Sequence, residues 1–395
     1  MRVLLLNQFY PPDVAPTGRL LHDLARTLAA RGHDVGAVCC RRRYTGGVPL
    51  PPRERIDGVR VHRVAATGFG RSGSLGRGID YLTYLAGAAS VVRRRRDVDL
   101  VLALTTPPLL GLAASVASRG RGAAIAHWVM DVYPDALAAG GSLDPDAAGY
   151  RWLQRLARAQ YRGARLVIGL GPCMERRLRV YLEAGVPLAS VPPWGPAPAD
   201  PRASALVRER RGWKADDLVL LYSGNMGRAH RFSEFLDAAA ALGPAGPLWA
   251  FAGGGPRRPE LERARGGRIA LLPYAPEDEL AASLGSGDVH LASLSTGWEG
   301  VVVPSKVSAA MTAGRPVIYV GPEGSAAAEW VRRSGGGWCV AEGRVADLIA
   351  AVAAAGDPAE RARRGRAARV FAVEHLDRER SCTAIARRLE ECAPG

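Results

Sequence analysis

The sequence is poor in several features that mark particular classes of protein. Phe, Trp and Tyr make up only 6% of the 395 residues, which argues against a surface that stacks nucleic-acid bases on exposed rings. The six cysteines form neither a CxxC pair nor a cluster with histidines at metal-ligand spacing, so the sequence predicts neither structural zinc nor disulfides. The longest uncharged stretch, residues 100–118, is interrupted by TTPP at 105–108. This favours a buried strand, a loop and a helix over a membrane span.

Lysine is scarce, although positive charge is not. Arg and Lys number 53 against 38 Asp and Glu, and only Lys214 and Lys306 are lysines. Residues 1–190 carry 27 basic and 14 acidic side chains, whereas residues 191–395 carry 26 and 24. The excess in the first half predicts an anionic partner such as a membrane surface, a pyrophosphate-bearing lipid or a nucleic acid. The opening MRVLLLNQF is strand-like rather than a secretion signal, which predicts a cytoplasmic protein.

Short apolar runs alternate with segments of helical periodicity along the chain. This pattern predicts α/β architecture with parallel sheets covered by helices on both faces. The predicted strands are 3–7, 35–40, 59–64, 100–104, 123–129, 166–170, 218–223, 248–253, 269–273, 289–294, 317–320 and 338–340. The proline-rich VPPWGPAPADPR near residue 191 divides the pattern. We therefore expect two doubly wound domains facing across a cleft, at 1–192 and 216–375, with a linker at 193–215 and a helix near 376–392 that joins the first domain.

Glycine-rich turns follow several strands of the second half. In open parallel sheets, ligands bind beyond the carboxyl ends of the strands, where glycine turns and helix N-termini present N–H groups to anions. GNMGRAHR follows one strand, FAGGG ends another, and LPY ends a third, where backbone groups are suited to a base edge. In GWEGVVVPSKVSAAMTAGRP, Ser305 is a candidate N-cap and Lys306 places a cation at the helix start. Each turn taken alone is also compatible with a tight turn that binds nothing.

These motifs, in this order and spacing, carry a resemblance that covers nearly the whole chain. GNMGRAH, FAGGGP, LPYAPEDEL, GDVHLASL and EGVVVPSKVSAAMTAGRPVI resemble the donor domain of family 4 of the retaining glycosyltransferases, which have the GT-B fold of two Rossmann-like domains. NQFYPPDVAPTGRLLHDLARTLAARGHDV, LTTPPLLGL and HWVMDVYPD resemble the acceptor domain of the bacterial branch that builds O-antigen, colanic acid and capsule repeat units.

The resemblance implies a nucleotide diphosphate sugar as donor, held by cations without a metal or other cofactor, with UDP favoured over GDP. By position, Arg228 and Lys306 are the implied cations and Glu299 the acid near the sugar hydroxyls. The implied donor-binding residues are Gly224, Asn225, Gly227, Arg228, Gly253, Gly255, Tyr274, Glu299, Gly300, Val301, Val302, Ser305 and Lys306. The family's second glutamate, which bonds the ribose, falls at Ala309, so Ser308 or backbone groups are the candidate substitutes. The DxD-like triplets at 97–99 and 144–146 lie at positions that do not suit a metal in the cleft.

In the first half, Asp131 of WVMDVYPD follows a strand and resembles the family's polar group near the reacting hydroxyl, so we expect it to orient or deprotonate the acceptor. A helix or turn cap is the alternative role. His127 is expected in the core. Thr17 and Gly18 are expected in the first strand-to-helix loop, near phosphate or acceptor.

The predicted reaction is transfer of a hexose-type sugar to a glycan or polyprenyl-diphosphate-linked acceptor, at a peripheral membrane surface, without nucleic acid. Basic runs at 93–96 and 151–165, and the segment 68–96, are candidates for lipid contact, although a solvated helix face explains such runs as well. A sugar-nucleotide epimerase of the same fold and a basic nucleic-acid-binding protein are the alternatives. No GxGxxG follows the first strand, which disfavours a nicotinamide-dependent oxidoreductase.

Overall fold

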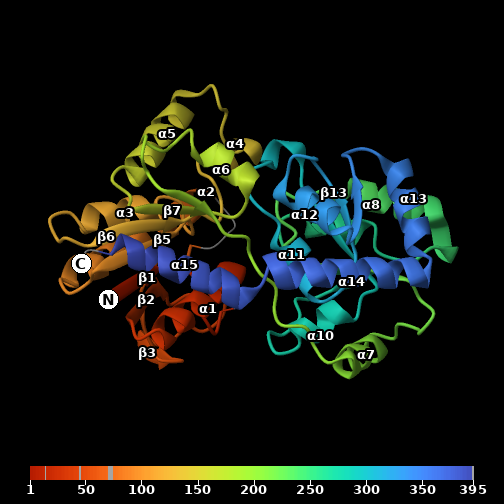
Figure 1. Ribbon diagram of the computed structural model, residues 1–395. Helices are drawn as coiled ribbons and strands as arrows, with labels where there is room; N and C mark the ends of the chain where they lie inside the picture. The colour runs from red at the N-terminus through yellow and green to blue at the C-terminus, as the bar shows by residue number, and fades with distance from the viewer. Residues whose placement is uncertain (14, 44–45, 70–73, 394–395) are drawn as a thin grey trace. The chain divides into compact units, whose positions relative to one another are not determined.

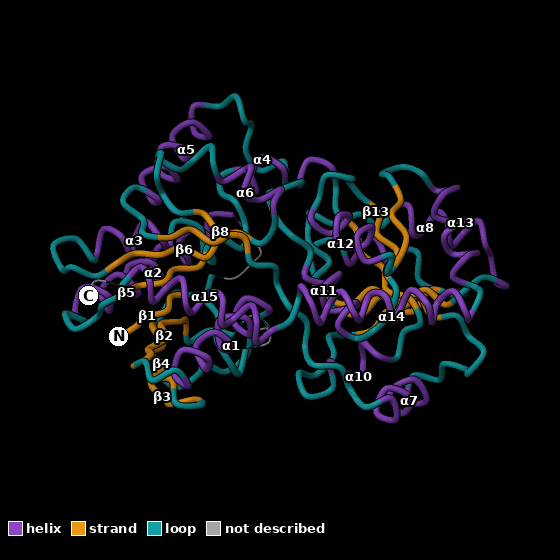
Figure 2. The backbone as a smooth tube through the Cα atoms, viewed as in Figure 1, coloured by secondary structure: helices purple, strands orange, loops and turns teal. Residues whose placement is uncertain are grey.

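The computed structural model describes residues 1–13, 15–43, 46–69 and 74–393. The chain divides into two compact units (Figure 1). Unit 1 comprises Met1–Pro192 and Arg378–Gly395, and unit 2 comprises Pro193–Asp377. Each unit is a sheet of mainly parallel strands covered by helices (Figure 2). The expected α/β class with two Rossmann-like domains is confirmed.

Unit 1 is built on an eight-stranded sheet in the order β3-β4-β2-β1-β5-β6-β7-β8. Its strands are β1 (Arg2–Leu6), β2 (Asp34–Cys40), β3 (Arg53–Ile56), β4 (Val59–Val64), β5 (Leu100–Leu104), β6 (Ala124–Trp128), β7 (Leu166–Gly169) and β8 (Leu188–Ser190). The edge strand β3, which the sequence patterns did not predict, runs antiparallel to β4, and the other pairs are parallel. The alternating exposure of β3 explains the omission, because this short strand lacks a buried apolar run.

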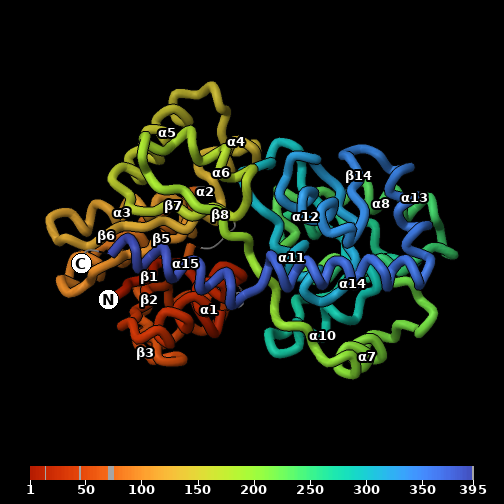
Figure 3. Tube along the Cα trace, viewed as in Figure 1, coloured from red at the N-terminus to blue at the C-terminus, as the bar shows by residue number. Residues whose placement is uncertain are grey.

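The helices of unit 1 are α1 (Pro16–Ala30), α2 (Ser74–Arg94), α3 (Leu110–Ala117), α4 (Asp135–Ala139), α5 (Ala148–Tyr161), α6 (Pro172–Leu178) and α15 (Arg378–Cys392). The C-terminal helix α15 packs against α1, as the trace in Figure 3 shows. Arg31, which caps the end of α1, pairs with Glu390 of α15 at 2.7 Å. The last helix of the chain therefore completes the N-terminal unit.

Unit 2 is built on a six-stranded parallel sheet in the order β11-β10-β9-β12-β13-β14. Its strands are β9 (Val219–Ser223), β10 (Leu248–Ala252), β11 (Ile269–Leu272), β12 (Val289–Ser293), β13 (Val317–Val320) and β14 (Gly337–Val340). Its α-helices are α7 (Pro201–Arg210), α8 (Ser233–Leu242), α9 (Arg258–Arg263), α10 (Leu280–Gly285), α11 (Ser305–Thr312), α12 (Ala326–Ser334), α13 (Val345–Ala355) and α14 (Pro358–His375). The stretch 193–215, expected as a linker, contains α7 within this unit.

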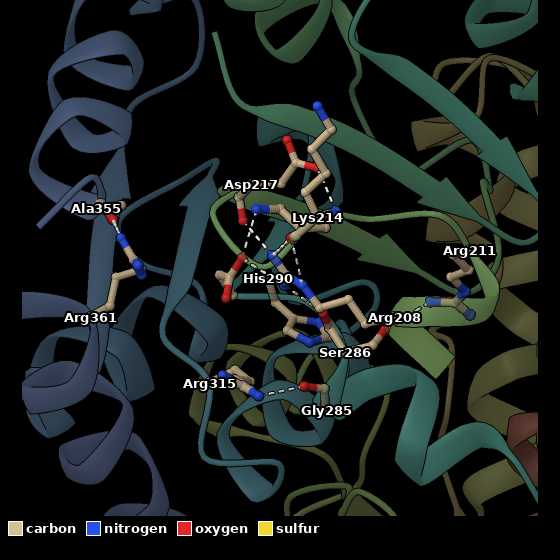
Figure 4. A network of polar contacts seen from close by, with 12 residues as sticks. Arg208, Arg211, Lys214, Asp217, Gly285, Ser286, His290, Arg315, Ala355 and Arg361 are labelled. Atoms are coloured by element: carbon tan, nitrogen blue, oxygen red, sulfur yellow. Dashed lines mark hydrogen bonds and ion pairs between the residues drawn. The ribbon is translucent and has the colours of Figure 1, made fainter. Parts of the chain in front are cut away.

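The amino ends of the strands of unit 2 carry a dense polar network (Figure 4). Arg208 of α7 bonds the Asp288 carboxylate at 3.0 Å and the backbone carbonyls of Ser286 and Lys214 at 3.2 and 3.0 Å. Arg315 donates to the carbonyl of Gly285, the last residue of α10. Arg361 donates at 2.6 Å to the carbonyl of Ala355, the last residue of α13. These guanidinium groups satisfy helix-end carbonyls that the helices leave without partners, so this basic cluster is structural.

Candidate functional site

The glycine turns after β9 and β10 pack backbone to backbone at the carboxyl edge of the sheet in unit 2. The Gly224 N–H donates to the Ala252 carbonyl at 2.9 Å, and the Met226 N–H donates to the Gly254 carbonyl at 2.7 Å. Gly253 has a φ of +130°, and a Cβ built there would lie 2.1 Å from the Gly224 carbonyl oxygen. Glycine is therefore required at 253 both by backbone conformation and by space.

Tyr274 and Asn225 complete this pair of turns. The Tyr274 hydroxyl donates to the Gly254 carbonyl at 2.9 Å, so its side chain holds the FAGGG turn. A Cβ built on Gly255 would lie 2.6 Å from Oδ1 of Asn225, which shows how closely the second turn approaches the first. The N–H groups of Asn225 and Gly227 donate to no acceptor within the described part of the chain. These two N–H groups are therefore available as hydrogen-bond donors at the carboxyl edge of the sheet.

Lys306 extends over the first of these turns. The side chain starts in the first turn of α11, and its Cε lies 3.2 Å from the position of a Cβ built on Gly224. Its Nζ lies 2.9 Å from Nε2 of His230 and 5.1 Å from the centre of the Tyr222 ring. Among the described residues no carboxylate pairs with Lys306. Burial lowers the pKa of Lys306 to about 7, because removal from water disfavours the charged form.

His230 fixes the direction of the contact with Lys306. Its Nδ1 lies 2.6 Å from the carbonyl oxygen of Ser293, the last residue of β12. A carbonyl only accepts hydrogen bonds, so Nδ1 carries the proton and Nε2 of the neutral ring accepts from Lys306. Burial and the charge of Lys306 lower the pKa of His230 well below its ordinary value. The sequence analysis missed His230, and the signal available there was its place within GNMGRAHR, directly after the glycine turn.

The two arginines of GNMGRAHR have different surroundings. Arg228 is exposed in the turn that precedes His230. Arg231 pairs with Glu234 of α8 at 2.8 Å and with Glu342, in the loop after β14, at 2.7 Å. Arg231 therefore ties two loops and a helix together, whereas Arg228 is the more exposed of the two arginines.

The segment before α11 departs from expectation at its backbone. Gly300 has a φ of +72°, and the N–H groups of Val301 and Val302 both donate to the Trp298 carbonyl, at 3.0 and 3.4 Å. The N–H groups of these two implied donor-binding residues are therefore already used within the turn. A Cβ built on Gly324 would lie 2.3 Å from Oε1 of Glu299, which places the Glu299 carboxylate against the turn that follows β13.

The structure also shows how α11 begins and what surrounds Ala309, the position of the family's second glutamate. Pro304 is the N-cap residue and Ser305 is the first helical residue, without a side-chain cap, so Ser305 is not the N-cap. The buried Ser308 hydroxyl donates to the Ser305 carbonyl at 2.8 Å, which turns it toward its own helix. A Cβ built on Gly195 would lie 2.6 Å from Cα of Ala309. The backbone at Gly195 packs directly on the helix, which explains a small residue at 309.

In unit 1, Asp131 lies three residues beyond the end of β6, between that strand and α4. Its backbone N–H donates to the Thr105 hydroxyl at 3.1 Å, whereas its carboxylate accepts no hydrogen bond within the described part of the chain. Pro134 is the N-cap residue of α4, so Asp131 does not cap that helix. Burial raises the pKa of Asp131 to about 6, which suits a group that exchanges a proton near neutral pH.

Thr17 and Gly18 form hydrogen bonds within unit 1, and His127 is buried there. Thr17 and Gly18 lie in the first turn of α1 rather than in the preceding loop. The Gly18 N–H donates to the Ala15 carbonyl at 3.0 Å, and the Thr17 hydroxyl accepts from the Asn7 amide at 3.2 Å. The Gly18 N–H is thus not available to a phosphate. His127 is buried, as expected, and burial lowers its pKa to about 4.

The two aspartate triplets do not converge on a metal site. Asp97 pairs with Arg95 at 2.9 Å and Asp99 with Arg2 at 3.0 Å. Asp144 accepts from the backbone N–H of Asp146 at 2.9 Å. Over the described ranges, His, Cys, Asp and Glu form no group of three or more that is suited to holding a metal ion.

No helix within the same described ranges has the length and apolar character needed to cross a membrane.

Comparisons with known proteins agree with this architecture. Residues 17–194 match the family described as glycosyl transferase 4-like domain, and residues 217–356 match the family described as glycosyl transferases group 1. The chain is 27% identical over 261 residues to WbjE of Pseudomonas aeruginosa, named as a probable glycosyltransferase, and this match spans 64% of each chain. It is 23% identical to WcaI of Escherichia coli K12, named for colanic acid biosynthesis, over 80% of this chain and 82% of WcaI.

Solved structures show the same fold at low identity. Sucrose-phosphate synthase from Thermosynechococcus elongatus superposes with a TM-score of 0.79 at 16% identity, covering 99% of this chain and 98% of that one. HepE of Anabaena, in complex with UDP-glucose, superposes with a TM-score of 0.72 at 17% identity, covering 99% of this chain and all of HepE. From these matches across both units, the chain belongs to family 4 of the GT-B glycosyltransferases.

Proposed function

We propose that this protein is a retaining glycosyltransferase that moves a hexose-type sugar from a nucleotide diphosphate sugar, with UDP favoured, to a glycan or polyprenyl-diphosphate-linked acceptor in cell-surface polysaccharide assembly. The observation that carries the proposal is the Lys306 ammonium: it lies over a glycine turn, and no carboxylate pairs with it within the described part of the chain. A partly buried cation without a counter-charge favours an anionic ligand. The relatives WbjE and WcaI and the UDP-glucose complex of HepE support the same assignment.

The diphosphate of the donor would be the anion at this edge. The Lys306 ammonium, the exposed Arg228 guanidinium and the N–H groups of Asn225 and Gly227 supply donors around one turn. Ser305 and Lys306 begin α11, whose N-terminal N–H groups favour negative charge. These groups would stabilise the charge that develops on the departing diphosphate, which is the step where fixed positive groups accelerate the reaction most. We place Glu299 near the sugar hydroxyls.

Retention of configuration follows if the acceptor hydroxyl attacks the face from which the diphosphate departs. A diphosphate oxygen would then accept the hydroxyl proton as the new glycosidic bond forms. In unit 1, the Asp131 carboxylate would orient the acceptor hydroxyl or, in place of the diphosphate oxygen, take its proton. Its pKa of about 6 leaves it mainly ionised at neutral pH, with a capacity to bind a proton.

Two cations at the diphosphate would replace the metal that other transferases use. A thermal-shift series with UDP-, GDP- and dTDP-sugars, each with and without EDTA, tests donor class and metal independence together. We expect one nucleotide class to raise the melting temperature and the increase to survive EDTA. An increase that disappears with EDTA contradicts the metal-free site, and the absence of any increase contradicts the donor proposal. Transfer of radiolabelled sugar to a lipid-linked acceptor, against conversion of the donor alone, separates the transferase from an epimerase.

Association with the cytoplasmic membrane surface completes the proposal. The first half of α2 exposes Leu75, Ile79 and Leu82, spaced to share one helix face. Arg93 and Arg94 close the same helix, and basic amphipathic helices bind anionic lipid surfaces. The candidate lipid segment 68–96 also includes residues 70–73, which lie outside the described residues. On α5, Trp152 is 57% exposed beside the arginines of that helix.

A further inference from the structure

A groove lies on the flank of the sheet in unit 1, between the edge strands and α2. It has a volume of about 760 Å³. Its floor comes from β1, β2 and β4, its outer rim from β3, and its wall from the second half of α2. The lining residues used below are Val38, Arg53, Arg60, His62, Arg94 and Arg95, and we call this cavity the edge groove. Asp131, Thr17 and the residues of unit 2 described above do not line it.

The register of the strands explains why the groove is apolar on one side and basic on the other. Val38 of β2 pairs with His62 of β4, and His62 pairs with Arg53 of β3. Side chains of paired residues point to the same face of a sheet, so this row changes from apolar to basic toward the edge. Val38 is in the core beneath α2. Beyond it, Gly36 leaves the next row without a side chain on β2.

The carboxylates near the groove neutralise only some of its arginines. Asp34 pairs with Arg60 at 2.7 Å, and Asp97 pairs with Arg95 at 2.9 Å. Glu54, which also lines the groove, pairs with Arg63.

Two arginines of the groove stay without a partner. The side chains of Arg53 on the rim and Arg94 on the wall form no hydrogen bond or ion pair within the described ranges of the chain. Two guanidinium groups from separate elements thus line one cavity, and no carboxylate of the described residues pairs with them.

His62 lies among the positive charges of the groove. Burial and the charges of Arg53, Arg95 and Arg94 together lower the pKa of His62. Its ring also lacks a hydrogen-bond partner among the described residues. The positive charges that act on this ring repel one another, and a bound anion would offset that repulsion.

We propose that the edge groove is a binding site for a phosphate group, with Arg53 and Arg94 as its two cationic ligands and His62 as a hydrogen-bond donor between them. Guanidinium groups suit phosphate because they offer paired N–H donors. The apolar floor at Val38 and Val64 accommodates a short hydrocarbon part beside the phosphate. The ligand class is thus a phosphate ester with an apolar part, supplied either as a soluble ester or as the headgroup of an anionic phospholipid. This site is independent of the proposed transferase activity.

Two double variants of the full-length protein test this proposal. Arg53→Gln with Arg94→Gln removes the two groove cations. Arg43→Gln with Arg119→Gln removes the same charge from unit 1 at two exposed residues that do not line the groove and lie outside the helices proposed above for lipid contact. The probes are glycerol 3-phosphate, followed by calorimetry, and vesicles of phosphatidylcholine with and without phosphatidylglycerol, followed by flotation. The donor edge of unit 2 is unchanged in both variants, so phosphate binding there cancels in the comparison.

We expect the groove pair to weaken binding at least about tenfold and the control pair to change it less than about twofold. Binding of glycerol 3-phosphate with this pattern identifies a soluble ester, and the pattern with phosphatidylglycerol vesicles alone identifies a lipid headgroup. An equal loss of binding in both double variants overturns the proposal, because the general positive charge would then explain binding. The proposal is also overturned if neither probe binds. The NMR titration of His62 in the wild-type protein provides a second test, and the His62→Gln variant serves only to assign its resonance. The midpoint of this titration should shift to higher pH when the probe binds. An unshifted titration overturns the proposal.

Discussion

The two ends of the sheet in unit 2 contain the same kinds of residue and use them differently. At the amino ends of the strands, Arg208, Arg315 and Arg361 donate to carbonyls and carboxylates (Figure 4). At the carboxyl ends, Lys306 contacts a neutral imidazole and an aromatic ring. Both ends carry positive charge, but at the carboxyl ends no carboxylate of the described residues pairs with Lys306. The comparison separates cations that are satisfied within the fold from a cation that could still pair with an anionic ligand.

The two buried histidines of this sheet show the same contrast. His290 points Nε2 at the Leu284 carbonyl, 2.9 Å away, and burial lowers its pKa to about 4. His230 also bonds a carbonyl through one nitrogen, but its other nitrogen accepts from Lys306. His290 thus anchors α10 to the sheet, whereas His230 contacts a cation that no carboxylate pairs with in the described part of the chain.

The largest expected effect is the loss of activity when the cations at the carboxyl edge are removed. Lys306→Ala and Arg228→Ala should each lower kcat/KM by roughly 10²-fold or more, because charge stabilisation at the leaving group is lost. Lys214→Ala is the matched control, since Lys214 is the only other lysine and lies near the amino-end network. A near-normal rate for either Lys306→Ala or Arg228→Ala would remove that residue from the mechanism.

The next effect concerns stability at the opposite end. Arg208→Ala should lower the free energy of unfolding by about 2–3 kcal/mol, because Asp288 and several carbonyls lose their donor. Arg210→Ala, in the same helix, removes an exposed pair with Glu279 and should cost less than about 1 kcal/mol. Denaturant unfolding of both variants measures the difference. Equal losses would contradict the structural role given to the amino-end cluster.

The pH dependence of donor affinity distinguishes the two clusters further. Lys306 is protonated below pH 7 and loses its charge as the pH rises through its pKa of about 7. Affinity for UDP-glucose should therefore be highest below pH 7 and should fall toward about tenfold per pH unit above it. Lys306→Arg keeps its charge over this range and should flatten the profile. Calorimetry from pH 6 to 9 measures both, and a flat wild-type profile would contradict the lowered pKa.

The smallest expected effect separates the two histidines. His230→Phe removes the acceptor for Lys306 and should weaken UDP-glucose binding by about fivefold to tenfold, the value of about one hydrogen bond. His290→Phe should lower stability and leave the affinity of the folded fraction unchanged. Calorimetric binding and thermal unfolding of both variants provide the comparison. If both changes affect only unfolding, His230 has no role in positioning Lys306.

Much of the architecture follows from local pattern. The alternation of apolar runs and helical periodicity predicted twelve strands of the two sheets, and the glycines of GNMGRAH and FAGGG predicted their turns, because these signals involve residues close in sequence. The antiparallel β3, the short β8 and the helix α7 lacked such a signal. Among site residues, Glu299 came from the resemblance, and Lys306 came from its place at a helix start as well as from the resemblance. His230 came from neither, because its partners Ser293 and Lys306 are 63 and 76 residues away.

The sequence by itself determined the α/β class, the division near residue 192, the glycine turns and the excess of arginine, since each depends on composition or on neighbouring residues. Tertiary structure decided which of these polar groups stay available. It used the N–H groups of Gly18, Val301 and Val302 within the fold, paired Arg208 and Arg231 with acceptors, and left Lys306, Arg53 and Arg94 without carboxylates among the described residues. The physical reason is that the acceptors come from distant segments, so only folding determines which donors they satisfy.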